Sequence, residues 1–297
     1  MTLKNTGILV TLYLSLCGYG RSKSADMSAF NRPNAGPPAT YFAAADSVPA
    51  SVLQAAAAAA SVVPKDAIYL FSLENSEKSI IHSDWLSFKE GAALSWVADM
   101  DVDCDGVNHK CDGNGDGQPQ TNWGALSAYA VPYIVIPDMF LAANKDILPG
   151  NNVAAVICGG KMFYGVLGDS NGDNPQITGE ASWLMARTCF PKEDLQGNNA
   201  HSPKDVTYIL FTGKEAVLPD TAINKNYITD FDTLRSMGDK FARALASNLA
   251  TPTTVSTATA TTTAGDSAAA MSNDDDRSDG LGCNGHDYSV TSRWLRW

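Results

Sequence analysis

The sequence predicts a mainly β (α+β) fold: a compact, β-barrel-like domain with a long C-terminal helix and disordered termini. Three observations predict it: short apolar segments rich in β-branched and aromatic residues, a glycine pair between two of them, and one long amphipathic segment. The composition changes abruptly on either side of these segments. The domain is therefore placed at residues 63–249, a length that suffices for one substantial core.

Six segments have the length and composition of β-strands. They are Ala67–Phe71, Ala93–Val97, Tyr133–Ile136, Val153–Cys158, Met162–Leu167 and Val206–Phe211. Gly159 and Gly160 separate the fourth from the fifth, and a glycine pair between two β segments favours a tight hairpin turn. Residues 153–167 are therefore predicted to form a hairpin, with Asp169 just past the end of its second strand.

Two segments have helical character. The longer one carries apolar residues at three- and four-residue spacing: Ile228, Phe231, Leu234, Met237, Phe241, Leu245 and Leu249. This stripe is expected to pack on the barrel. The shorter one, Ala181–Cys189, contains neither proline nor glycine, so Glu180 is expected at the start of a helix.

The two ends of the chain have compositions that do not form a core. Lys4 precedes an apolar run at residues 7–16, which predicts a secretory signal peptide over residues 1–25. Residues 26–62 are rich in Ala, Ser and Pro and are expected to be a mobile, low-complexity lead-in with at most a short helix. Residues 250–297, a Thr- and Ala-rich stalk and then an acidic and aromatic tail, are expected to be disordered.

These features predict a soluble, exported protein. The apolar run at residues 7–16 is too short to span a bilayer, which takes roughly twenty apolar residues. The formal net charge of −11 repels nucleic acid and anionic membranes and attracts cations. We expect a secreted, extracellular monomer without nucleic-acid or membrane partners.

The cysteines are consistent with an oxidising compartment. Two disulfides are expected, Cys104 with Cys111 and Cys158 with Cys189. Cys17 belongs to the signal segment, and Cys283 is left as an odd thiol in the tail. No cysteine or histidine cluster has the spacing of a zinc site, so no metal is expected there.

The most informative stretch is residues 164–182, where Asp169 and Glu180 flank a Gly- and Asn-rich loop. Cleaving a glycosidic bond takes one carboxylic acid to protonate the leaving oxygen and one carboxylate to activate water or to attack. Each residue also has a structural alternative, Asp169 as a turn residue and Glu180 as a first-turn acid of a helix. The residues alone leave both interpretations open.

A second group of acids alternates along the chain after the predicted strand at residues 93–97. Alternation places Asp99, Asp101, Asp103 and Asp105 on one face, and Asp116 lies in a second oxygen-rich segment a little further on. Such crowding is costly unless a cation neutralises it. Three interpretations remain open: a calcium site, a surface for a polyamine or poly-glucosamine chain, and a solvated loop closed by the first disulfide.

Trp96 and Trp123 lie near these acids in the sequence. Both are candidates for stacking on a sugar ring, because an indole offers a large flat apolar face. Tryptophan in such segments is also often partly buried in the core, so this assignment stays open too.

Six short motifs follow one another along the chain. They are DMDVDCDG at 99–106, GQPQT at 117–121, YGVLGDSNG at 164–172, TGEAS at 178–182, CFP at 189–191 and VTYILFTG at 206–213. In this order they resemble the fungal-type chitosanases of glycoside hydrolase family 75, over most of residues 67–249. The sequence departs from the family in the lead-in, the stalk, the tail and residues 173–175.

The resemblance implies an endo-chitosanase that hydrolyses β-1,4 links between glucosamine units of chitosan, with inversion and without a cofactor. Carried over by motif, Glu180 is the general acid and Asp169 the base for the attacking water. Protonated chitosan is a polycation, so residues 99–105 and Asp116 are expected to line its subsites, with Trp123 as a further substrate contact. The alternative is a non-catalytic secreted module that binds polycations or calcium through residues 99–116.

Overall fold

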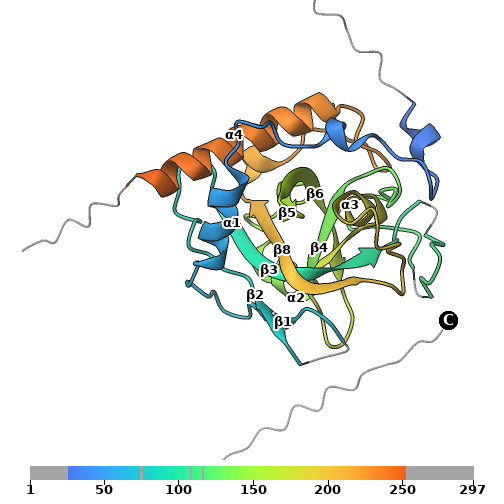
Figure 1. Ribbon diagram of the computed structural model, residues 1–297, viewed down its shortest axis with the longest axis horizontal. Coiled ribbons are helices and arrows are strands. Elements are labelled where there is room, and N and C mark those ends of the chain that lie inside the picture. Colours follow the sequence, from blue (N-terminus) through green and yellow to red (C-terminus); the bar gives the residue numbers. More distant parts are fainter. Residues whose placement is uncertain (1–25, 74–75, 108, 116, 252–297) are drawn as a thin grey trace, which may run out of the picture. The chain divides into compact units, whose positions relative to one another are not determined.

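A closed six-stranded barrel forms the centre of the protein. The computed structural model describes residues 26–73, 76–107, 109–115 and 117–251. The barrel strands are β3 (Ala93–Asp103), β4 (Tyr133–Pro137), β5 (Val153–Cys158), β6 (Lys161–Asn171), β7 (Glu180–Ser182) and β8 (His201–Phe211). They follow the order β3-β7-β4-β6-β5-β8 around the barrel, which confirms the predicted fold class (Figure 1).

The barrel contains both parallel and antiparallel pairs of strands. β7 runs parallel to β3, and β6 runs parallel to β4, whereas β8 is antiparallel to both β3 and β5. The predicted hairpin is present: β5 and β6 pair antiparallel, and Gly159 and Gly160 turn the chain with φ of 53° and 73°. Glycine adopts this left-handed backbone without a steric penalty, which is why a glycine pair suits the turn.

Large aromatic side chains fill the interior. Trp96, Tyr133, Tyr164 and Tyr208 are among the largest fully buried residues. The Trp96 indole stacks on the ring of Tyr208 with centroids 5.2 Å apart. Trp96 is therefore a core residue rather than a platform for a sugar.

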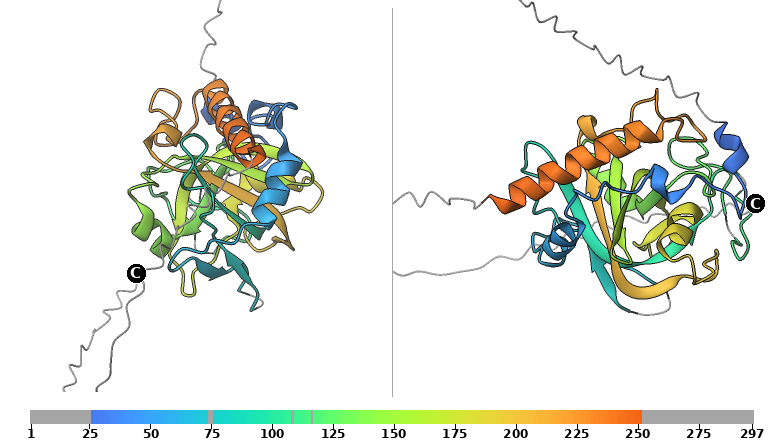
Figure 2. Two further views of the ribbon diagram at one scale, coloured as in Figure 1. Left: turned by 90° about the vertical axis from the view of Figure 1, so that its left-hand side faces the viewer. Right: turned by 45° about the horizontal axis from the view of Figure 1, so that its top comes forward.

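The helix α4 (Phe231–Ala250) lies along one side of the barrel, as Figures 1 and 2 show in orange. Its N-terminus is capped by Asp230, whose carboxylate accepts a hydrogen bond from the Thr233 N–H at 3.1 Å. The predicted apolar stripe faces inwards, with Leu234 and Leu245 fully buried and the helix in contact with β5 and β6. The predicted long C-terminal helix is thus confirmed.

Residues 26–62 are packed against the barrel, in contrast to the mobile lead-in that their composition suggests. They form the short 3-10 turns η1 (Met27–Phe30) and η2 (Ala39–Tyr41) and the helix α1 (Ala50–Ala58). Phe42 and Leu53 are fully buried, and α1 contacts α4 and β3. The physical reason is that a few large side chains anchor a segment whose many alanines fit closely against its neighbours.

The remaining elements are short. They are a two-stranded antiparallel ribbon of β1 (Ile68–Leu70) and β2 (Lys78–Ile80), the helices α2 (Asp138–Asn144) and α3 (Trp183–Cys189), and the 3-10 turn η3 (Lys214–Ala216). Both expected disulfides are present, Cys104–Cys111 and Cys158–Cys189. In the described ranges, no helix combines the length and apolarity that crossing a membrane requires. The expected signal segment, the stalk, the tail and Cys283 lie outside the described residues.

Candidate active site

Asp169 lies within β6 rather than past its end, which corrects the sequence-based expectation. The strand continues to Asn171 because β4 pairs with it in parallel as far as Pro137. Asp169 is only 4% exposed, and its Oδ1 accepts hydrogen bonds from the N–H groups of Asn122 at 3.1 Å and Ser170 at 2.9 Å. Its Oδ2 is buried without a hydrogen-bond partner among the described residues.

Glu180 opens the short strand β7 rather than a helix, a second correction. β7 forms because its backbone pairs with β3 on one side and with β4 on the other. The helix begins only after Ser182, whose hydroxyl caps it by accepting a hydrogen bond from the Met185 N–H at 3.3 Å. The Glu180 Oε2 is also buried without a partner among the described residues.

An acidic cleft of about 690 Å³ lies at the ends of these strands. The predicted acids Asp99, Asp101, Asp103 and Asp105 all line it, together with Glu180, Asn171 and Asp173. The segment 196–202 contributes a further part of the wall. The alternation along β3 therefore delivers its acids to one cavity, whereas Asp116 lies outside the described residues.

Asp169 does not line this cleft itself, but it lies beside two acids that do. Carboxylate oxygens of Asp103, Asp105 and Asp169 lie within 4.8 Å of one another, close enough to share a cation. The Tyr133 hydroxyl donates a hydrogen bond to Asp103 Oδ1 at 3.2 Å, which holds that carboxylate in place. Three carboxylates at this spacing suit a hard cation or an ammonium group equally well.

The environment raises the pKa of both candidate catalytic acids. Burial and the nearby Asp103 raise the pKa of Asp169 to about 8, with a smaller contribution from Asp105. Burial also raises the pKa of Glu180 well above its usual range, and repulsion from Asp103 and Asp101 adds to it. The site therefore contains two carboxyl groups that keep their protons to unusually high pH.

Asp99 is a third buried acid with a raised pKa. Burial and the neighbouring Asp101 raise the pKa of Asp99 to about 9, and the residue is only 2% exposed. Its Oδ1 lies against Gly179, where an added Cβ would come within 2.3 Å of it. Two features therefore favour glycine at position 179, next to Glu180: the close contact with Asp99 and a backbone φ of 98°, which other residues rarely adopt.

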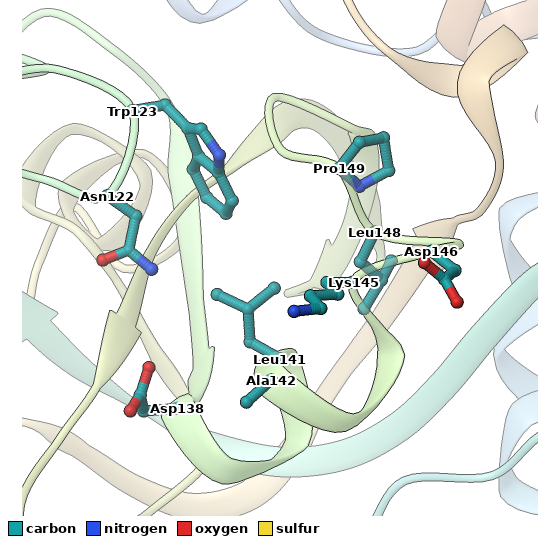
Figure 3. A pocket seen from close by; sticks show the side chains of 9 residues that line it. All are labelled: Asn122, Trp123, Asp138, Leu141, Ala142, Lys145, Asp146, Leu148 and Pro149. Atoms are coloured by element: carbon teal, nitrogen blue, oxygen red, sulfur yellow. The ribbon is translucent and has the colours of Figure 1, made fainter.

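Trp123 lies away from the acidic cleft. It lines a separate hollow with Leu141, Lys145 and Pro149, which Figure 3 shows from close by. The link between the two regions is Asn122, which donates its backbone N–H to Asp169. The structure therefore does not bring Trp123 together with the predicted acids.

Sequence reasoning missed several polar residues of the site. Asn171 donates a side-chain hydrogen bond that partly opposes the rise in the pKa of Glu180, and Asn122 and Ser170 both hold Asp169. Asn171 and Ser170 belong to the same motif as Asp169, so their proximity in the sequence was the available signal. The segment 196–202 carries no sequence pattern that points to the cleft.

The cleft is lined by carboxylates, and Asp99, Glu180 and the adjacent Asp169 all have a raised pKa. Paired carboxyl groups, one of them protonated, are what a glycoside hydrolase requires. Residues 100–244 match the family model described as fungal chitosanase of glycosyl hydrolase group 75. The chain belongs to this family.

Similarity to individual proteins agrees with the family assignment. The chain is 62% identical to endo-chitosanase C of Aspergillus oryzae over 249 residues, which are 84% of this chain and 65% of that protein. It is 36% identical to endo-chitosanase B of the same organism, covering 55% of this chain and 80% of the relative. It is 38% identical to an endo-chitosanase of Aspergillus fumigatus, covering 49% of this chain and 68% of the relative. The matched region thus spans less than two thirds of endo-chitosanase C.

Proposed function

We propose that the protein is a secreted endo-chitosanase that hydrolyses β-1,4 links between glucosamine units of chitosan by an inverting two-carboxylate mechanism. The observation that carries the proposal is the pair Asp169 and Glu180. Each has a raised pKa and one buried oxygen without a partner among the described residues. The names of the similar proteins support the substrate.

In this mechanism Glu180 is the general acid. Burial in the barrel wall and repulsion from Asp103 keep its proton in place until the substrate is bound. Glu180 then gives that proton to the glycosidic oxygen as the bond from the anomeric carbon to this oxygen breaks. Asp169 takes a proton from a water molecule, and the water oxygen bonds to the anomeric carbon on the opposite face.

Asp169 must be ionised to act as the base, and the bound substrate is expected to cause this ionisation. Repulsion from Asp103 and Asp105 is part of what raises the pKa of Asp169 to about 8. Ammonium groups of a bound glucosamine chain beside these two carboxylates would offset that repulsion and lower the pKa of Asp169. The base is therefore expected to form when a polycationic chain occupies the cleft.

The acidic cleft also selects the substrate. Its lining holds Asp99, Asp101, Asp103, Asp105, Asp173 and Glu180 and, among the described residues, neither lysine nor arginine. Such a cavity attracts a chain of ammonium groups and gives a neutral polysaccharide no comparable electrostatic gain. We assign this catalytic role to a domain over residues 63–249.

Two further parts of the proposal rest on chemistry outside the cleft. The disulfides Cys104–Cys111 and Cys158–Cys189 support an exported protein, because such bonds persist in oxidising compartments. The net charge of −11 supports a protein that binds neither nucleic acid nor anionic membrane. We expect it to act as a monomer.

One assay tests the function. Purified protein should release reducing ends from highly deacetylated chitosan, and Glu180→Gln and Asp169→Asn should each lower the rate by at least about a hundredfold. Glu215→Gln, which alters an exposed carboxylate on η3, is the matched control and should keep full activity. Melting curves show whether each variant remains folded.

Two outcomes would overturn the proposal. One is the absence of reducing ends at every pH from about 4 to 7. The other is a folded Glu180→Gln variant that hydrolyses chitosan at the rate of the unaltered protein. Binding of chitosan without hydrolysis would instead support a non-catalytic polycation-binding module.

A further inference from the structure

Tyr208 is a fully buried tyrosine whose ring has a fixed place inside the barrel. It lies on β8 directly opposite Trp96 on β3, two strands that Figure 1 shows side by side. The two rings stack, with 5.2 Å between their centroids and 2° between their planes. A phenylalanine would pack and stack in the same way, so the phenolic hydroxyl group needs an explanation of its own.

The Tyr208 hydroxyl donates to two backbone carbonyl groups. One belongs to Asp99 on β3, at 2.8 Å, and the other to Gly179, at 2.9 Å, immediately before Glu180. In the barrel β3 lies between β8 and β7, so this side chain reaches past one strand to the start of the next. A single hydroxyl thus joins β8, β3 and the residue that precedes β7.

The Asp99 carbonyl lies where β3 and β8 lose their regular register. The pairing shifts on either side of Asp99, so that one residue of β3 lies opposite four exposed residues of β8, 202–205. An irregularity of this kind locally disrupts the backbone ladder. The Tyr208 hydroxyl supplies a donor to the Asp99 carbonyl at this point.

The Gly179 carbonyl belongs to the peptide group whose nitrogen is that of Glu180. This carbonyl also accepts a hydrogen bond from the Asp101 N–H at 2.9 Å. Two donors, one from β3 and one from β8, therefore hold the same peptide group. Because a peptide group is planar and rigid, they also fix the position of the Glu180 Cα, from which the carboxyl side chain extends.

Tyr208 does not touch the place where a substrate would lie. It is not one of the described residues that line the acidic cleft, whereas Glu180 is, and its side chain is fully buried. An effect of the hydroxyl on the reaction therefore has to pass through the backbone that it holds. Such an effect can be large, since a misplacement of about 1 Å in a reacting group can cost about a hundredfold in rate.

We propose that Tyr208 is a positioning residue for Glu180: its hydroxyl holds the peptide group between Gly179 and Glu180, so that the carboxyl group meets the glycosidic oxygen. The inference rests on the proposed role of Glu180 as general acid. It adds a requirement that lies outside the cleft. It also gives a role to a residue of the motif at 206–213, which the two proposed catalytic carboxylates leave unexplained.

Removing the hydroxyl tests the proposal. Tyr208→Phe should lower kcat on deacetylated chitosan about tenfold or more and leave KM within about twofold of its original value. Tyr164→Phe is the matched control, because Tyr164 is also fully buried and its hydroxyl donates to Asp239 on α4 at 2.9 Å. Both variants lose a buried hydrogen bond and should melt at a lower temperature, but only Tyr208→Phe should lower kcat.

Replacing Tyr208 by 4-aminophenylalanine tests the two hydrogen bonds directly. The aromatic amine of this residue has N–H donors for both the Asp99 and the Gly179 carbonyl. It should keep kcat within about threefold of that of the unaltered protein. A folded protein with this residue and a kcat as low as that of Tyr208→Phe would contradict the proposal.

A double variant separates positioning from a general loss of structure. If Tyr208 acts through Glu180, adding Tyr208→Phe to Glu180→Gln should leave the residual rate unchanged within about twofold. A further loss of about tenfold would overturn the positioning role, since independent effects multiply. An unaltered kcat in a folded Tyr208→Phe variant, or an equal loss in Tyr164→Phe, would overturn it as well.

Amide exchange keeps this inference separate from the proposed function. The amides of β7 should exchange about tenfold faster in Tyr208→Phe than in the unaltered protein, and those of β5 should respond no more than they do in Tyr164→Phe. Unchanged exchange in β7 overturns the positioning role even if chitosan is hydrolysed. Faster exchange in β7 of a protein that does not hydrolyse chitosan would overturn the proposed function and leave the two hydrogen bonds as its anchor.

Discussion

Asp101 on β3 lies in register with Glu180 on β7, so two acidic residues are direct neighbours across a parallel pair of strands. Neighbouring strands lie about 4.8 Å apart, which leaves two ionised carboxyl groups strongly repelled. Asp101 is accordingly one of the groups that raise the pKa of Glu180. Burial contributes most to the protonation of the proposed general acid, followed by Asp103, and strand pairing adds the contribution of Asp101.

Asp103→Asn should move the pH profile of activity towards lower pH. Asp103 raises the pKa of both Asp169 and Glu180, so removing its charge lowers both values. The acid limb follows the base and the alkaline limb follows the acid, so both limbs of kcat/KM should shift in the same direction. The measurement is kcat/KM on a short glucosamine oligomer from pH 3 to 9. Asp173→Asn is the comparison: Asp173 raises the pKa of Glu180 least among the neighbouring acids and is no cause of the raised pKa of Asp169, so only the alkaline limb should move, and by less. A shift towards higher pH would contradict the assignment.

Asp99→Asn should make stability less dependent on pH. Because the folded-state pKa of Asp99 is raised to about 9, its contribution is fully present below the unfolded value near 4 and is lost as the pH rises through 9. The melting temperature of the unaltered protein should therefore fall between pH 5 and pH 9. Asp99→Asn should reduce this fall by about 2–4 °C for each kcal/mol removed. Asp220→Asn, at an exposed position, should leave the fall unchanged.

Gly238→Ala should destabilise the protein although the residue lies inside a helix. Alanine normally stabilises a helix relative to glycine by about 1 kcal/mol. Here the new Cβ would come within 2.4 Å of the Tyr164 ring, whose hydroxyl is held by Asp239 at 2.9 Å. The expected loss is about 1–3 kcal/mol in the free energy of unfolding, from denaturant titration. Gly115→Ala, which meets no atom within 4 Å, is the control, and a gain in stability at Gly238 would refute the packing argument.

His201→Phe should loosen one wall of the cleft. His201 is buried, stacks on Phe190, and contacts Glu193 Oε2 at 2.7 Å and Asp205 Oδ1 at 2.9 Å. Phenylalanine keeps the stacking but loses both carboxylates, so the segment that begins at Glu193 loses an anchor. We expect faster amide exchange over residues 193–200 and a KM raised roughly threefold or more, with a smaller change in kcat.

Lys192→Ala alters an exposed residue beside the same segment and should change neither amide exchange nor KM. If His201→Phe raised KM while amide exchange over residues 193–200 stayed as slow as before, the anchoring role would be wrong. If both variants accelerated exchange equally, the segment would be sensitive to any substitution.

The sequence predicted well those elements whose partners are close along the chain. The hairpin of β5 and β6 and the helix α4 follow from a glycine pair and from one apolar stripe, both of which are local signals. β3 was expected to end at Val97 because the apolar segment ends there. It continues to Asp103 because β7, about eighty residues further on, pairs with it, and such pairing leaves no local pattern.

The candidate site shows the same division. Asp169 and Glu180 stand out in the sequence through motifs, and the alternation of acids along residues 99–105 places them correctly in one cleft. Their surroundings depend on which strands meet, so the strand position of Glu180, the contribution of residues 196–202 and the separate location of Trp123 were not predictable. Likewise, Phe42 and Leu53 gave no periodic signal of the packing of residues 26–62.

Closure of the barrel has a consequence for how copies of this chain meet at high concentration. Every barrel strand has a neighbour on both sides, so no strand of the barrel has an edge that is open along its whole length. An open sheet would offer an edge on which a second chain could add a strand, the usual start of edge-to-edge aggregation. The same ring of strands that carries the acids of the cleft thus withholds the barrel strands from that route, whether or not a substrate is bound.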